Sequence, residues 1–275
     1  MDLKQQRCIV VLANERVGYV TLEKLIMNGY DIRAVFTSHP DRKAKIADFI
    51  DFSSLKKKYS HIPFHYILSP REPLVVEKIQ SYSPDIILAI SWSQILPREI
   101  IFYPRLGTIG VHYSLLPERR GGAPLIWALI DGNEKTGLTL FYYDEGIDTG
   151  DIIDQIEIQI KYKDTVKTLL KKIEKKLPAL VLKNLDSILA KTNRRIMQDG
   201  SKATYTSART PKDGEINWSM PVEKIYDFIR AQTSPYPCAF SRIIDKQGNT
   251  KKLIIPEALV KDGKLIIKGS IEDFE

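Results

Sequence analysis

The side chains best suited to chemistry in this sequence lie between residues 105 and 155. His112 ends an apolar stretch that is typical of a strand, and Asp148 lies in an acidic, glycine-flanked loop after a second such stretch. An imidazole can accept and return a proton near neutral pH, and a neighbouring carboxylate can orient the ring and stabilise its cation. These two residues therefore indicate the acid-base site of an enzyme.

Apolar runs that alternate with helical patterns must position these side chains. Strand-like runs cover residues 8–13, 32–37, 64–66 and 86–90, and helical patterns cover 17–27 and 74–82. The runs are apolar on both faces, which is typical of a parallel sheet covered by helices. The expected fold class is α/β, with a Rossmann-like, mostly parallel sheet flanked by helices.

The pattern changes after Gly200. A polar, turn-rich segment leads to a short helix over residues 222–230, and short strands are expected at 241–244, 252–255 and 264–268. We therefore expect two domains: a Rossmann-like catalytic domain over residues 1–200 and a small, mostly β C-terminal domain over 201–275.

Composition excludes several other classes of protein. With 43% hydrophobic and 27% charged residues among 275, the chain is expected to fold around a sizeable core. Its two cysteines, Cys8 and Cys238, are too far apart in sequence to indicate a disulfide framework or a metal motif. The first apolar stretch is too short for a signal peptide or a membrane span, so a cytoplasmic protein is expected.

The formal charge of +7 is concentrated in one segment. Residues 161–195 hold 11 Lys and Arg against 3 Asp and Glu, a net charge of +8, which leaves −1 for the rest. Apolar residues recur there at helical spacing, and Pro178 is expected to begin a second helix. The lysines therefore form either the solvated face of amphipathic helices or a surface that faces RNA or phosphate.

The turn after the first strand has two interpretations. It reads LANERVGY and places Gly18 near the start of a helix, where Asn14 and Arg16 could donate hydrogen bonds to an anion. It lacks the glycine-rich dinucleotide fingerprint, so an ordinary strand-to-helix turn is the alternative.

Taken together, the motifs resemble the folate-dependent formyltransferase family. The matching stretches are SWSQILPREI, GTIGVHYSLLPERRGGAPLIWALIDG, YYDEGIDTGDII and INWSMPVEKIYDFIRAQTSPYPCAF. The resemblance implies transfer of the formyl group of N10-formyltetrahydrofolate to an amine. It also implies an active site made of an Asn-x-His pair and the Asp of DTG. His112 and Asp148 match the last two of these residues, and Gly110 replaces the Asn.

The loss of the Asn removes one hydrogen-bond donor to the formyl oxygen, which typically costs on the order of 10²–10³ in rate. Another donor could replace it: the backbone N–H of Gly110, an ordered water in the space beside it, or a side chain. At the same time, Gly110 could make room for a bulky substituent on the acceptor. Alternatively, the chemistry is altered, or catalysis is impaired and the chain only binds a nucleotide sugar or folate. The candidate side chains are Ser91, Ser93, Gln94 and Asn133.

The resemblance also implies binding residues. The pterin of the folate is expected against two loops, one with Ser93, Gln94, Ile95 and Leu96, the other with Asp144, Glu145, Gly146 and Ile147. The acceptor is expected near Arg119, Arg120 and Gly121, with Asn14 and Arg16 as further candidates. No spacing of His, Cys or Asp indicates a metal site.

Three acceptors are compatible with the resemblance. The glycinamide ribonucleotide branch is shorter than this chain, whereas the methionyl-tRNA branch is usually longer and carries a basic insertion near the catalytic histidine. The expected acceptor is therefore a UDP- or dTDP-linked amino sugar for surface glycans, and methionyl-tRNA is the alternative. A homodimer formed through the C-terminal region is possible, with Trp218, Tyr236 and Phe240 as interface or core residues.

Overall fold

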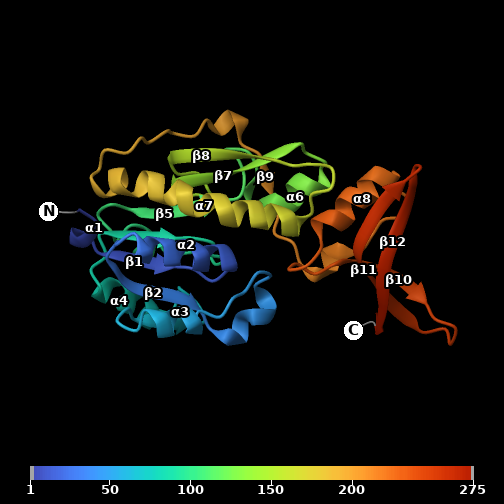
Figure 1. Cartoon of the computed structure of the whole chain (residues 1–275), viewed down its shortest axis with the longest axis horizontal. Coiled ribbons are helices and arrows are strands. Elements are labelled where there is room, and N and C mark those ends of the chain that lie inside the picture. The colour runs from blue at the N-terminus through green and yellow to red at the C-terminus, as the bar shows by residue number, and fades with distance from the viewer. Residues whose placement is uncertain (1–2, 274–275) are drawn as a thin grey trace. The chain divides into compact units, whose positions relative to one another are not determined.

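The computed structural model describes residues 3–273, which divide into two compact units (Figure 1). The first unit comprises the described residues up to Arg120, with Gly137–Ile156 and Lys172–Thr204. The second comprises Gly121–Thr136, Glu157–Lys171 and the described residues from Tyr205 onward. The end of the first unit at Thr204 lies close to the boundary expected at residue 200, but the second unit also takes two earlier segments.

A seven-stranded sheet organises the first unit, in the order β3-β2-β1-β4-β5-β7-β8. The strands from β1 to β5 pair in parallel, and β7 pairs antiparallel to β5. The mostly parallel sheet expected from the apolar runs is therefore confirmed. The strands are β1 (Ile9–Leu12), β2 (Ile32–Ser38), β3 (Phe64–Ile67), β4 (Ile86–Ala89), β5 (Thr108–His112), β7 (Lys135–Tyr142) and β8 (Ile152–Gln159).

Both faces of the central strands are buried, as their apolar runs predict. On one face, Val10, Phe36 and Ile87 pack with Ile79 and Ile100 from two of the helices. Side chains alternate along a strand, so Val11 and Leu88 face the opposite side, and these are also buried. The helices of this unit are α1 (Leu3–Gln6), α2 (Arg16–Met27), α3 (Ser53–Lys58), α4 (Pro73–Ser81) and α5 (Arg98–Ile101), with 3₁₀ turns η1 (Pro40–Lys45) and η2 (Gly200–Lys202).

The basic segment forms one helix, α7 (Val166–Leu189), so the expectation that Pro178 begins a second helix is wrong. A proline inside a helix removes a hydrogen bond and costs about 3 kcal/mol. Burial of a continuous apolar stripe offsets that cost: Val166, Leu169, Ile173, Leu177, Val181, Leu185 and Ile188 are all buried. Lys167, Lys171, Lys175 and Lys176 are exposed, as a solvated helix face requires.

The second unit contains a small antiparallel sheet, as expected. Strands β10 (Ala239–Ile244), β11 (Thr250–Lys261) and β12 (Lys264–Asp273) form it, and all are longer than the sequence pattern indicates. Ile225 and Ile229 of α8 (Val222–Ala231) pack on Ala239 and Ile255. The remaining elements are α6 (Pro124–Ile130), η3 (Pro211–Gly214) and the short strands β6 (Arg120–Gly121) and β9 (Tyr205–Thr206).

The aromatic residues considered for an interface differ in exposure. Phe240 is buried, and the Lys252 ammonium lies 4.1 Å from its ring centroid. Trp218 remains 46% exposed, and its indole donates to Ser241 Oγ. Tyr236 is half-buried. Within residues 3–273, none of the helices combines the length and apolar character that crossing a bilayer requires.

Candidate functional site

His112 ends β5 at the carboxyl edge of the parallel strands, and both nitrogens of its ring have neighbours. Nε2 lies 2.7 Å from the carbonyl oxygen of Arg119, and Nδ1 lies 3.5 Å from Oδ2 of Asp148. A carbonyl oxygen can only accept, so Nε2 carries the hydrogen of that bond. Nδ1 is therefore the nitrogen that can exchange a proton, and it faces the carboxylate.

The loop that carries Asp148 must turn back to bring this residue close to His112. Because β7 is antiparallel to β5, its last residue, Tyr142, pairs with Ile109, near the start of β5. The loop after β7 must fold back along β5 to bring Asp148 to its far end. Asp148 has a φ of +55°, in the left-handed region that non-glycine residues seldom adopt.

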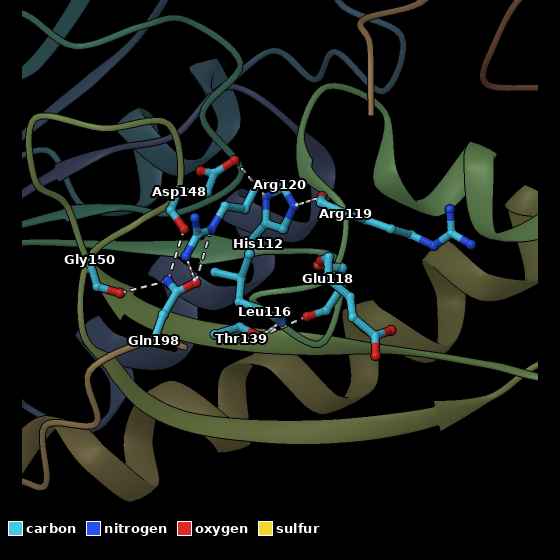
Figure 2. A network of polar contacts seen from close by, with 10 residues as sticks. His112, Leu116, Glu118, Arg119, Arg120, Thr139, Asp148, Gly150 and Gln198 are labelled. Carbon is cyan, nitrogen blue, oxygen red and sulfur yellow. Dashed lines mark hydrogen bonds and ion pairs between the residues drawn. The ribbon is translucent and has the colours of Figure 1, made fainter. Parts of the chain in front are cut away.

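Gln198 anchors this loop (Figure 2). Its Nε2 donates to the carbonyl oxygens of Asp148 and Gly150, at 2.9 and 2.7 Å. Its Oε1 accepts from the guanidinium of Arg120, at 2.8 Å to Nη2. One amide side chain therefore ties together the loop that carries Asp148 and the end of the segment that follows His112.

The segment after His112 is also fixed to the sheet. The Thr139 hydroxyl donates to the carbonyl oxygen of Ser114 and accepts from the backbone N–H of Leu116, at 2.7 and 3.1 Å. Ser114 Oγ in turn donates to the carbonyl oxygen of Glu118. The Arg119 carbonyl that holds the imidazole therefore belongs to a braced turn.

The space beside Gly110 is filled by the ring of Tyr143. A Cβ added to Gly110 would lie 2.2 Å from Cε2 and 3.0 Å from Cζ of that ring, closer than real contacts allow. The Tyr143 side chain, rather than open space for a water or for part of an acceptor, therefore lies beside Gly110 in this structure. Gly110 instead accommodates a side chain of this protein.

The first loop expected to bind the pterin contacts the turn after β1. The Asn14 amide donates to Ser93 Oγ at 2.9 Å and to Ser38 Oγ at 3.1 Å, and Gln94 also donates to Ser38. Ile95 is 70% exposed, whereas Leu96 is 3% exposed and belongs to the core. Of the two apolar residues, only Ile95 can therefore contact a ligand without a change in the core.

The second such loop lies against the first. Arg98, which follows the first loop, forms an ion pair with Glu145, and Ile147 is 63% exposed. Asp144 has an internal role, because its Oδ1 accepts from the Gly146 N–H and from Thr149 Oγ1. The two loops therefore present one exposed isoleucine each.

The residues expected to bind the acceptor do not form one cluster. Arg119 is half-buried, whereas Arg120 is buried and bonded to Gln198. Arg16 forms an exposed ion pair with Glu174, at 2.9 Å. Gly121 lies in the second unit, where a Cβ would meet the Thr206 carbonyl oxygen at 2.5 Å. A backbone role explains Gly121, and Arg119 is the more exposed of the two adjacent arginines.

Gly18 is explained by packing. A Cβ there would lie 2.6 Å from the carbonyl oxygen of Ile90. The turn after β1 therefore needs glycine so that α2 can approach the end of β4 closely, whether or not it binds an anion.

Two carboxyl groups near this turn make stability depend on pH. Burial, and then the Asp48 carboxylate, raise the pKa of Glu15 from 4.5 to about 8. Burial also raises the pKa of Asp48 to about 6, against the effect of Arg16. Between pH 4.5 and 8 the unfolded chain has lost a proton that folded Glu15 retains, so stability falls as the pH rises through this range.

Replacement of Glu15 by Gln is expected to remove most of this pH dependence. At pH 8 the variant should have an unfolding free energy about 1–3 kcal/mol higher than wild type. This is less than the full pKa shift of Glu15 implies, because Glu15 is only partly buried. At pH 4.5 and below the two proteins should differ little. Urea denaturation at pH 4.5 and 8 measures both values, and equal slopes against pH in wild type and variant would contradict the assignment.

Sequence reasoning missed Tyr143, Thr139 and Gln198. Tyr143 directly precedes the second loop. In the sequence, the missing side chain at Gly110 indicates that a neighbouring side chain could lie there, but it does not indicate which one. Gln198 lies some fifty residues after Asp148, and no motif marks it. Within residues 3–273, no group of three or more His, Cys, Asp and Glu side chains could hold a metal ion.

Comparison with known proteins identifies the family. The family described as Formyl transferase matches residues 8–185, and Formyl transferase, C-terminal domain, matches 209–271. The bifunctional polymyxin resistance protein ArnA of Wigglesworthia glossinidia brevipalpis is 36% identical over 97% of this chain, which spans only 40% of that protein. A methionyl-tRNA formyltransferase of Bacillus cytotoxicus is 34% identical over 86% of this chain and 75% of its own length.

Solved structures share the fold. A 4-N formyltransferase from Francisella tularensis superposes with a TM-score of 0.73 at 22% identity, over 93% of this chain and all of the other. WlaRD, a sugar 3N-formyl transferase studied with dTDP and 5-N-formyl-THF, superposes with a TM-score of 0.64 at 20% identity, over 96% and 94%. Because the Formyl transferase match covers most of the sequence, the chain belongs to the formyl transferase family and is an enzyme that transfers formyl groups.

Proposed function

We propose that this enzyme moves the formyl group of N10-formyltetrahydrofolate to the amine of a UDP- or dTDP-linked amino-deoxy sugar, in the cytoplasm, for surface glycan biosynthesis. The observation that carries the proposal is the 3.5 Å approach of His112 Nδ1 to Asp148 in a chain of this family. His112 and Asp148 lie in the same unit as the two loops that hold Ile95 and Ile147.

The loops that carry Ile95 and Ile147 have the features needed to bind the pterin of the formyl donor. Ile95 and Ile147 are exposed on loops joined by the ion pair between Arg98 and Glu145, and apolar side chains so placed can hold a flat pterin ring. Main-chain amides of the same loops can pair with the polar edge of the ring. Ser93 and Gln94 are fixed by Asn14 and Ser38, which gives the first loop a defined shape.

His112 acts as the base in the proposed mechanism. The acceptor amine loses a proton as its nitrogen bonds to the formyl carbon, and His112 Nδ1 takes that proton. Asp148 stabilises the imidazolium that forms, while the Arg119 carbonyl keeps the ring in place through Nε2. When the bond from the formyl carbon to N10 breaks, His112 returns the proton to N10.

A nucleotide sugar is favoured over tRNA by the segment that follows His112. Residues 113–123 connect β5 to α6 through the short strand β6, are braced by Thr139 and Ser114, and carry no basic insertion that could contact a tRNA stem. Arg119 lies at the end of this turn and can pair with the diphosphate. The likeness to a sugar formyl transferase is consistent with this acceptor.

The decisive experiment supplies N10-formyltetrahydrofolate and a panel of UDP- and dTDP-amino sugars, and follows release of tetrahydrofolate. Turnover with one of the sugars is expected. Turnover only with charged initiator methionyl-tRNA would overturn the acceptor, and binding without turnover would support a catalytically impaired binding protein.

Methionyl-tRNA remains the second candidate because of two observations. Relatives with that name align over most of this chain, and the exposed lysines of α7 form a basic face. If that face binds tRNA, affinity should fall steeply as salt rises from about 50 to 200 mM. A nucleotide sugar, with two phosphates, should show a much weaker dependence on salt.

A further inference from the structure

Where the family has Asn, this chain has Gly110, and a large aromatic residue from the neighbouring strand segment lies beside it. Gly110 pairs with Phe141 on β7, and Tyr143 follows two residues later on the same face of the sheet. Phe141 and Tyr143 stack, with ring centroids 5.3 Å apart. The Tyr143 ring therefore leans diagonally along β5, and its Cζ, which carries the hydroxyl, lies where side-chain atoms of a larger residue 110 would be.

The Tyr143 hydroxyl is suited to donate a hydrogen bond. Burial, and then the charge of Asp148, raise the pKa of the Tyr143 phenol above its ordinary value. The phenol therefore stays protonated throughout the range in which such an enzyme works.

Three of the four side chains considered as replacements have hydrogen-bond partners of their own. Ser91 Oγ pairs with the Tyr113 hydroxyl, Ser93 accepts from Asn14, and Gln94 donates to Ser38. Tyr143 is distinguished from all four because it occupies the vacated position itself.

We infer that Tyr143 is a catalytic residue whose hydroxyl supplies the hydrogen bond to the formyl oxygen that the missing Asn would have given, and that Gly110 and Tyr143 are an obligatory pair. As the amine nitrogen bonds to the formyl carbon, the carbonyl π electrons move to oxygen. The phenol stabilises that oxyanion without giving up its proton. When the bond from carbon to N10 breaks, the electrons return and the carbonyl re-forms. The inference rests on the proposed catalytic site but not on the choice of acceptor.

Four variants test the inference: Tyr143→Phe, Tyr143→Leu, Gly110→Asn and the double variant Gly110→Asn/Tyr143→Leu. Tyr143→Phe keeps the ring and is expected to lower kcat by about 10²–10³-fold, with little change in the thermal midpoint. Gly110→Asn alone forces the ring aside and should lower both kcat and the thermal midpoint. In the Tyr143→Leu background the same substitution restores a donor with room to fit, and should raise kcat at least about tenfold.

The matched control is Tyr142→Phe. Tyr142 is the preceding residue of the chain and the last of β7, faces the other side of the sheet and donates to Asn193 Oδ1 at 3.1 Å. Loss of its hydroxyl should leave kcat unchanged. A general effect of removing a buried phenol would lower kcat in both variants and would contradict a specific role for Tyr143.

The result that would overturn the inference is a Tyr143→Phe enzyme within about threefold of wild type, or a Gly110→Asn effect on kcat of the same sign in both backgrounds. The assay uses whichever acceptor the wild type turns over, so turnover of tRNA alone would refute the sugar proposal while still testing Tyr143. The thermal midpoints provide a readout that needs no turnover: equal losses from Gly110→Asn in the wild-type and Tyr143→Leu backgrounds would refute the pairing.

Discussion

Replacement of His112 by Gln is expected to lower kcat/KM by about 10²–10⁴-fold, the contribution that a positioned acid-base group typically makes. The Gln amide can still donate to the Arg119 carbonyl, which the imidazole contacts at 2.7 Å, so the turn should keep its shape. It cannot accept a proton from the amine.

The same substitution at His61 is the control. His61 is exposed and lies outside the proposed site, so His61→Gln should match wild type in activity. Steady-state kinetics of the three proteins between pH 5.5 and 9 provide the measurement. A His112→Gln enzyme within tenfold of wild type would remove His112 from the role of base.

The fold was predictable because its strongest signals are local. Apolar runs such as Ile86–Ala89 are buried on both faces of a parallel sheet, and their composition alone distinguishes them from half-exposed strands. The prediction that Pro178 begins a new helix was wrong. A proline is recognised in the sequence as unfavourable inside a helix, whereas the buried apolar stripe that offsets its cost is established only by the packing of the whole helix.

The sequence predicts which residues the candidate site contains, but not how the chain brings them together. The residue types and motifs identified His112 and Asp148, yet they could not show that β7 runs antiparallel to β5 and that the loop must fold back to bring the two together. Gln198 and Tyr143 contact the site between segments distant in sequence or across a strand pair. Such contacts leave no periodicity in a single sequence.

Replacement of Asp148 by Asn is expected to lower kcat by about 10²–10³-fold. The carboxylate lies 3.5 Å from Nδ1 in a largely buried pair, and loss of its charge should cost about 3–4 kcal/mol of stabilisation of the imidazolium. In a serine protease triad the corresponding change costs about 10⁴, because the wrong tautomer forms. Here the Arg119 carbonyl already fixes the hydrogen on Nε2, so the smaller effect is expected.

Asn is chosen because it tolerates the left-handed φ of +55° at this position, and because the hydrogen bond from Gln198 to residue 148 goes to its main-chain carbonyl. If Asp148 acts through the imidazole, its charge has nothing to stabilise once His112 is replaced by Gln. The double variant His112→Gln/Asp148→Asn should then be no slower than His112→Gln alone. Fully multiplicative losses would instead show that Asp148 acts directly on the acceptor amine, and would assign the proton transfer to the carboxylate as well as to the histidine.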